Sequence, residues 1–296
     1  MTSAALSSAP APSQRPAAAG TAGSARPAPS ARGSRSTRTA PGFFTSVRVE
    51  ILKMRRLRVL LVTALLLVAS IAMSGLELSS LARQGHLSEP SAQPWTALLL
   101  SMAMFNALTQ PIFVAILASR QTDIEHSGAG WNLAATSGLT PGALCRVKLA
   151  ALTLLIVPAT IAQSAVLIVV ARSMGLSLPL DAGPWVVYTL LLALVDTAMC
   201  AYHLWLAAVV ENQLVVMSAG LLGGFIGVYM LLAPPVLARL LPWGYYAVIT
   251  PAKVSMVNGH DAYEYISVPA GWIAGFAALT AVVFTVVTRR LDRIER

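Results

Sequence analysis

Six long stretches of the sequence carry almost no charge, and this feature limits what the chain can fold into more than any other. About 20 apolar residues in a helix cross the hydrocarbon core of a bilayer. The stretches are close to that length or longer, and Asp196 is the one Asp, Glu, Lys or Arg inside them. We therefore expect an all-α polytopic membrane protein with six transmembrane helices. The stretches are Val59–Leu76, Trp95–Ser119, Leu149–Ala171, Pro184–Val210, Asn212–Pro234 and Val268–Thr288.

The composition supports a membrane protein over a water-soluble enzyme. Of the 296 residues, 56% are hydrophobic and 11% are charged, against about a quarter charged in an average soluble domain. No basic stripe with interleaved aromatic residues is present, so we expect no nucleic-acid binding. The two cysteines, Cys145 and Cys200, form no CxxC motif and predict neither a disulfide framework nor a zinc site.

The distribution of basic residues predicts the orientation of the spans. With six spans and both termini in the cytoplasm, 17 of the 21 Lys and Arg residues fall in inner segments, as the positive-inside rule requires. The apolar segment 236–250 contains Arg239 and Pro242 and is too short to cross comfortably. We expect residues 235–252 to form a re-entrant or surface-lying element on the outer side. The predicted location is the plasma membrane.

The N-terminal part of the chain divides into two segments. Residues 1–42 are rich in Ala, Pro, Ser and Arg and have no apolar run, which predicts a disordered basic tail. From Phe43 to Arg58, apolar residues recur at helical spacing and four basic residues lie elsewhere on the same helix. This pattern predicts an amphipathic helix at the inner membrane surface. Alternatively, the segment is a plain cytosolic extension of the first span. In either case, we expect residues 43–296 to form one transmembrane domain.

The sequence lacks the motifs of several enzyme classes. It has no GxxxxGK[ST] loop for nucleotide phosphates, no HExxH, no GxSxG and no paired carboxylates within the spans. No two of its four histidines are spaced four residues apart. We expect a protein that is not an enzyme and binds no cofactor or metal.

Asp196 lies deep in the fourth span, where a charge is costly unless it is paired or hydrated. Cys200 and His203 follow on the same helical face. One interpretation is that Asp196 and His203 line a hydrated translocation path or gate. The alternative is a structural one, in which a protonated Asp196 bonds to a neighbouring helix, with Gln163 or Asn106 as its partner.

Small residues recur four apart in the fifth span, at Gly220 and Gly224 and again at Gly223 and Gly227. A similar pair, Gly271 and Gly275, occurs in the sixth span. Such spacing lets membrane helices approach closely. It predicts helix packing or dimerisation and identifies no substrate.

The inner loop 120–148 is long and more polar than its surroundings. We expect a short helix from Trp131 to Thr136, and Pro141 is expected to begin the helix of the third span. A structured loop on a bundle without chemistry of its own predicts docking to another protein. The alternative is a passive connector with Trp131 among the lipid headgroups.

At this loop the chain resembles the permease subunits of ABC-type exporters, in the six-span type-2 class, and especially permeases of lantibiotic-immunity and peptide-export systems. The resemblance covers roughly residues 43–290. It departs from the family pattern at Gly142-Ala143-Leu144, where the family often has a basic residue. The residues that carry it are Ser46–Arg56, Glu125-His126-Ser127-Gly128, Trp131, Pro141, Lys148, and the proline-rich element from Pro234-Pro235 to Leu241-Pro242-Trp243.

The resemblance implies a membrane-spanning subunit of an ATP-driven exporter for an amphipathic peptide, antibiotic or lipid-like substrate, acting in resistance or immunity. A separate ABC ATPase subunit would bind ATP and Mg, and a second permease subunit would complete a homo- or heterodimer. The other functions considered are a stand-alone secondary transporter or channel and a non-transporting membrane assembly factor. The residues expected to contact the ATPase are Glu125, Trp131, Pro141, Arg146 and Lys148.

Overall fold

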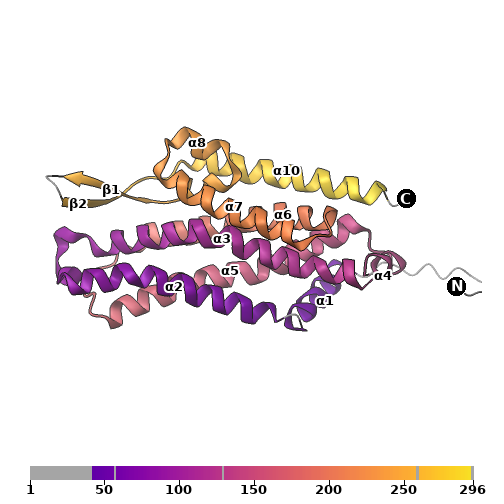
Figure 1. Ribbon diagram of the computed structural model, residues 1–296, viewed down its shortest axis with the longest axis horizontal. Helices are drawn as coiled ribbons and strands as arrows, with labels where there is room; N and C mark the ends of the chain where they lie inside the picture. The colour runs from indigo at the N-terminus through magenta and orange to yellow at the C-terminus, as the bar shows by residue number, and fades with distance from the viewer. Residues whose placement is uncertain (1–41, 57, 129, 258–259, 295–296) are drawn as a thin grey trace, which may run out of the picture. The chain divides into compact units, whose positions relative to one another are not determined.

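The computed structural model describes residues 42–56, 58–128, 130–257 and 260–294. Except for Gly42, the predicted disordered tail lies outside these residues. The described chain is a helical bundle with one short β-hairpin (Figure 1). The helices are α1 (Phe43–Arg56), α2 (Val59–Arg83), α3 (Pro94–Ser127), α4 (Gly130–Thr136), α5 (Pro141–Ser173), α6 (Ala182–Val209), α7 (Gln213–Leu232), α8 (Pro235–Leu240), α9 (Tyr245–Val248) and α10 (Ala270–Ile294). The 3-10 turns are η1 (His86–Ser88), η2 (Pro90–Ala92) and η3 (Pro242–Gly244), and the strands are β1 (Ala252–Val257) and β2 (His260–Tyr265).

Six of these helices, α2, α3, α5, α6, α7 and α10, are long and apolar enough to cross a membrane. They correspond to the six predicted stretches, so the six-span helical class is confirmed. Three of the described helices begin with a side-chain cap: Thr140 on α5, Asp181 on α6 and Asn212 on α7 each accept a backbone N–H. Pro141 occupies the first turn of α5, as predicted.

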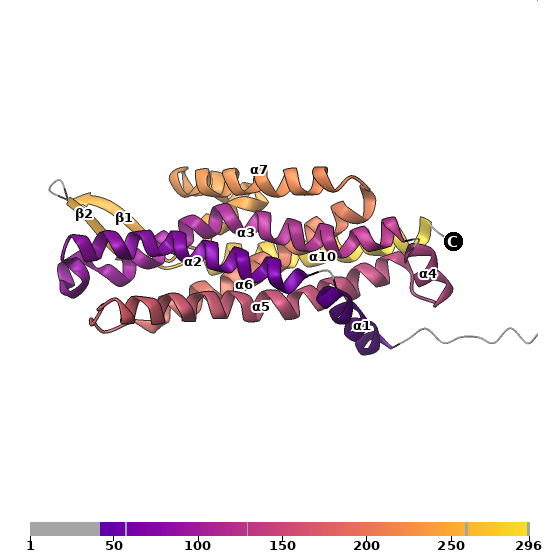
Figure 2. The same cartoon turned by 60° about the horizontal axis from the view of Figure 1, so that its bottom comes forward.

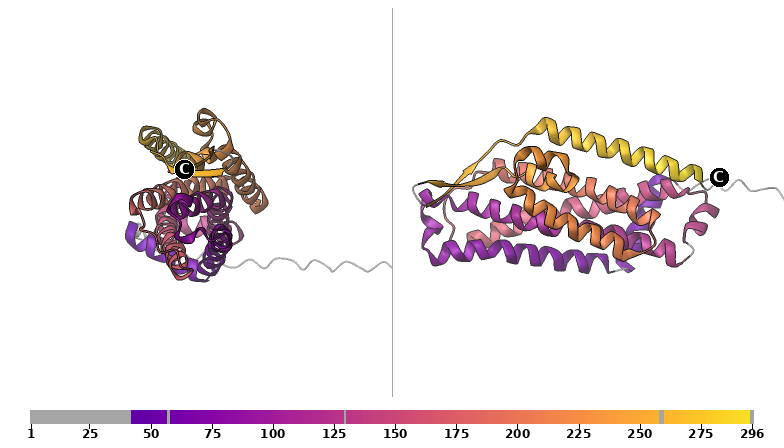
Figure 3. Two further views of the ribbon diagram at one scale, coloured as in Figure 1. Left: turned by 90° about the vertical axis from the view of Figure 1, so that its left-hand side faces the viewer. Right: turned by 45° about the horizontal axis from the view of Figure 1, so that its top comes forward.

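Helix α3 occupies the centre of the bundle and contacts α2, α6 and α7. Helix α5 packs against α2, α6 and α10, and α1 crosses its end at an angle (Figure 2). Helix α10 runs along one side, where it touches α5 and α6 (Figure 3). The core is therefore built around α3, α5 and α6, while α10 has the least buried surface of the six long helices.

The segment after α7 does not form a seventh long helix. It folds as α8, η3 and α9, which pack back against α7, α3 and α6. The antiparallel hairpin β1–β2 follows and pairs Lys253 with Glu264 and Val254 with Tyr263. This hairpin was not among the elements expected from the sequence. Alternation in Ala252–Val257 and the sequence Asn258-Gly259 are signals for one.

Candidate functional site

A buried cluster of charges joins α1, α3 and α5 at the end of the bundle that carries α4. The Lys148 ammonium donates to Glu50 Oε2 at 2.8 Å, to Glu125 Oε1 at 2.8 Å and to the Gln121 carbonyl at 2.9 Å. Lys148 is 0% exposed, Glu50 2% and Glu125 3%. Because each of these charges is paired and hydrogen-bonded, burial is tolerated.

Lys53 and Gln121 complete the cluster. The Lys53 ammonium bonds Glu50 at 2.6 Å and Glu125 at 3.0 Å, and the Gln121 amide donates to Glu50 Oε2 at 2.7 Å. Partial burial opposes the charge on Lys53, but its bonds to the two carboxylates prevail and raise its pKa above the usual value of 10.5. Two carboxylates thus face two ammonium groups.

The cluster lies beyond the uncharged stretches of α3 and α5, which end at Ser119 and begin at Leu149. With 34 residues, α3 is about 51 Å long at 1.5 Å per residue, against about 30 Å for the hydrocarbon core. The ends of α3 and α5, connected by α4, therefore project as a stalk (Figure 1). The cluster fixes α1 to both helices of this stalk.

Two of the predicted ATPase contacts, Glu125 and Lys148, are members of the cluster. Their side chains bind one another and present almost no surface. Glu50, Lys53 and Gln121 were not predicted as site residues. Glu50 carried a signal of its own, because it is the sole acidic residue before Glu77. Its partners on α3 and α5 follow 71 to 98 residues later, which spacing along the chain does not reveal.

Trp131 points toward the bundle from α4. Its indole N–H donates to His126 Nδ1 at 3.3 Å, and His126 Nε2 lies 2.8 Å from the Ala207 carbonyl on α6. The ring packs on a small cluster that includes Cys145 and Phe284. Trp131 therefore holds α4 against the bundle. The apolar side chain that α4 presents outward is Leu133, which is 67% exposed.

Arg146 is the predicted contact that joins α5 to the end of α10. Its guanidinium donates to Thr288 Oγ1 at 3.0 Å and to Asp292 Oδ2 at 3.2 Å. Gly142 lies against the Thr288 carbonyl at the same place, where a Cβ would not fit. The side chain of Arg146 is 38% exposed. It keeps part of its surface available while it fixes α10.

A hollow of about 420 Å³ lies beside the charge cluster at the tip of the stalk. Its walls come from α1, α4 and the ends of α3 and α5. The lining combines Glu50, Lys53 and Glu125 with the apolar side chains Val49, Leu133, Leu139 and Leu144.

Asp196 is fully buried at the middle of α6 and accepts a hydrogen bond of 2.8 Å from the Tyr246 hydroxyl. The prediction that Gln163 or Asn106 is its partner is wrong. Those two amides bond each other at 2.7 Å and, with Ser70, Gln110 and Tyr188, form a network joining α2, α3, α5 and α6. Tyr246 of α9, and not α3 or α5, therefore supplies the hydrogen bond to the Asp196 carboxyl group.

His203 lies on the same helix, also fully buried. Neither ring nitrogen has a hydrogen-bond partner among the described residues, and the ring packs edge-on against Tyr202 with centroids 5.1 Å apart. Asp196 and His203 share no bond. Their predicted role in a translocation path stays a prediction. Within the described ranges, no group of three His, Cys, Asp or Glu residues is arranged to hold a metal ion.

The α7 glycines pack within the chain. A Cβ at Gly220 would meet Ala115 and Pro111 of α3, one at Gly224 would meet the Leu108 carbonyl, and one at Gly227 the Ala107 carbonyl. Gly223 faces the Trp243 indole. Of the two predicted roles, packing is therefore the one these four glycines serve in this structure.

A comparison with models of known protein families and with curated proteins finds no match for the chain.

Proposed function

We propose that the chain is the membrane-spanning subunit of an ATP-driven ABC exporter. A separate ATPase subunit would bind ATP and Mg and dock on the stalk tip, and a second permease subunit, identical or different, would complete the translocation path. The substrate class is an amphipathic peptide, antibiotic or lipid-like compound, exported across the plasma membrane in resistance or immunity. Both termini lie in the cytoplasm in this proposal.

The observation that supports this proposal most is the linkage of the stalk. A partner that moves α4 also moves α3 and α5, because both continue without interruption into the membrane. The cluster of Glu50, Lys53, Glu125 and Lys148 makes α1 follow them. This arrangement suits a subunit that receives work at its cytosolic end. A connector without a partner has no need of it.

The docking surface we propose is the hollow at the stalk tip, with Leu133 as its exposed apolar anchor. Covering an exposed Leu side chain in an interface contributes about 1.5–3 kcal/mol through the burial of apolar surface. Glu125 and Lys148 act from behind this surface by holding its walls together. Trp131 acts in the same way by fixing α4.

The test is purification of the full chain from its own membrane, with identification of stoichiometric partners by mass spectrometry. We expect a protein with a P-loop whose ATP hydrolysis stays with the complex. Leu133→Asp should reduce its recovery about tenfold, since the exposed anchor is replaced by a charge. Asn132→Asp, which adds the same charge to the neighbouring exposed position, is the matched control and should retain the partner.

Two results would overturn the proposal. One is the absence of any P-loop ATPase from the stoichiometric partners of the wild-type chain. The other is transport by the purified chain alone in vesicles, which identifies a secondary transporter or a channel. A stable ATPase complex that moves no amphipathic substrate in vesicles would favour an assembly factor.

A further inference from the structure

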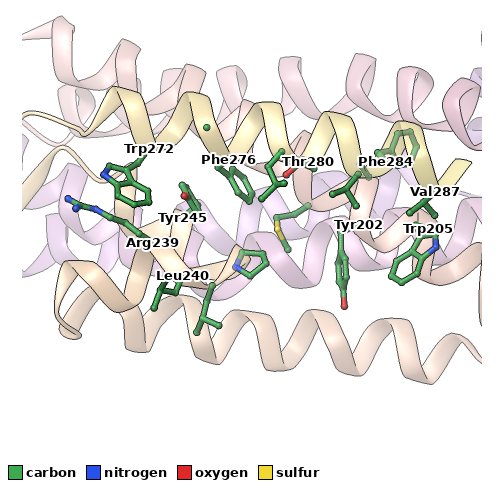
Figure 4. Close-up of a pocket in the computed structure, with 18 of the residues that line it drawn as sticks. Tyr202, Trp205, Arg239, Leu240, Tyr245, Trp272, Phe276, Thr280, Phe284 and Val287 are labelled. Carbon is green, nitrogen blue, oxygen red and sulfur yellow. The ribbon is translucent and has the colours of Figure 1, made fainter.

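A second hollow, distinct from the stalk, runs along the side of the bundle between α6, the α8–η3 element and α10. Its volume is about 700 Å³, within the range of pockets that bind small molecules. Figure 4 shows it lined by aromatic and aliphatic side chains, with Trp205 at the end near Val287 and Trp272 at the other. We call it the lateral groove.

The lateral groove has one charged residue in its lining, Arg239. The guanidinium carbon lies over the Trp272 ring, 5.3 Å from its centroid, which is a cation–π contact. Among the described residues Arg239 forms no salt bridge, and its Nε has no hydrogen-bond partner. A guanidinium in a cation–π contact still has N–H groups along its edge, in a geometry that matches phosphate.

An unpaired cation at one end of a long apolar groove is complementary to an anionic amphiphile. We propose that the lateral groove binds one anionic phospholipid from the leaflet on the hairpin side. Arg239 holds the phosphate and the α10 wall holds an acyl chain. This site does not depend on the proposed ATPase.

The dimensions of the groove fit this occupant. From Gly271 to Val287 the α10 wall is about 24 Å long at 1.5 Å per residue. Half the hydrocarbon core is about 15 Å, so a chain descending from Trp272 extends past Phe276 and Leu279. Gly271 and Gly275 keep this wall open, because no atom lies within 4 Å of where their Cβ atoms would be.

A second copy of the chain fits the lateral groove less well. A two-fold contact places the same surface on both sides, and the lining contains no acidic residue. Such a contact would bring two arginines into an apolar interface with no carboxylate to pair them. An anionic headgroup supplies the missing charge.

The test measures lipids retained by the purified full chain in native mass spectrometry, after incubation with dioleoylphosphatidylglycerol or dioleoylphosphatidylcholine vesicles. We expect wild type to retain the anionic lipid preferentially. Arg239→Gln should lower that retention about tenfold, the usual effect of losing a charge-assisted hydrogen bond. Arg239→Lys should keep the preference because the charge remains. Gly275→Leu should lower retention by filling the groove.

Two matched controls separate the groove from general effects. Arg83→Gln removes an exposed arginine at the same end of the bundle, and Gly75→Leu fills an equally open glycine on α2. Both should bind lipid as wild type does. Equal retention of the two lipids by wild type would overturn the proposal. Retention of the anionic lipid at the wild-type level by both Arg239→Gln and Gly275→Leu would also overturn it. So would a dimer that Gly275→Leu disrupts while lipid binding stays unchanged.

Discussion

Lys148 is 0% exposed, and Glu50, Glu125 and the Gln121 carbonyl take the place of bulk water around its ammonium group. The two carboxylates depend on it in turn, since Lys53 alone does not balance both. Removing one member of a buried ion pair leaves an uncompensated charge, which costs about 3–5 kcal/mol. The fold is therefore more sensitive to the loss of one member of this cluster than to the loss of one partner of a surface pair.

We expect Lys148→Met to lower the free energy of unfolding in detergent by about 3–5 kcal/mol. Combining it with Glu125→Gln should cost less than the sum of the two single changes, because the second change removes the unpaired charge. Lys253→Met, at the exposed pair with Glu264 on the hairpin, is the control and should cost less than about 1 kcal/mol. Denaturant titration measures all four variants. A Lys148→Met protein as stable as the control would show that the cluster contributes nothing.

Asp196 makes one hydrogen bond, to Tyr246, and its Oδ2 has no partner among the described residues. Tyr246→Phe removes that bond without changing the shape of the ring. We expect the free energy of unfolding in detergent to fall by about 1–3 kcal/mol, which is the cost of an unsatisfied buried polar group. Tyr245→Phe, at the neighbouring residue stacked on Phe276, is the matched control and should change little.

The same contact bears on the predicted gate. Asn at position 196 can still accept the Tyr246 hydrogen bond. Asp196→Asn with normal stability and normal transport therefore assigns the residue a structural role. Loss of transport with normal stability assigns it to the path.

At the scale of the helices, α7 and α10 use similar glycine pairs differently. Gly220, Gly224 and Gly227 of α7 lie against the backbone of α3, whereas Gly271 and Gly275 of α10 face open space. Gly224→Ala should therefore cost about 1–3 kcal/mol, because its Cβ meets the Leu108 carbonyl. Gly275→Ala should be neutral or stabilise by up to about 1 kcal/mol. Unfolding in detergent distinguishes them, and equal effects would contradict the packing described for α7.

The sequence contained enough information for the long helices and for the first turn of α5. Hydropathy reports burial in lipid directly, and Pro141 marks a helix start. The partners of Asp196 and Lys148 could not be identified from the sequence. Tyr246 lies 50 residues from Asp196, on an element whose path depends on packing against α7 rather than on its own periodicity. The spacing of the α7 glycines predicted close packing against another helix, but it did not identify that helix as α3.

At the scale of the whole domain, the six long helices place α4 and the hairpin on opposite sides of a membrane. Asn132 on α4 and Ser255 on the hairpin are both exposed. Cys145 and Cys200 are buried, so the unmodified chain should react little with thiol reagents.

We expect Ser255→Cys to react with a membrane-impermeant maleimide added to intact cells, and Asn132→Cys to react only after permeabilisation. We expect this pattern because the excess of Lys and Arg on the α4 side predicts that this side faces the cytoplasm. The opposite pattern would reverse the orientation. Reaction of both in intact cells would contradict six crossings.

Membrane thickness is the last consequence, and it follows from α7. Its 20 residues make a helix of about 30 Å, which matches an average hydrocarbon core with nothing to spare. A helix in a thicker bilayer usually adjusts by tilting. Gly220, Gly224 and Gly227 fasten α7 to α3 along its length, so it cannot tilt alone. In a thick bilayer, the membrane beside α7 must become locally thinner instead. The lipid-facing surface of α7 will therefore favour lipids with short acyl chains.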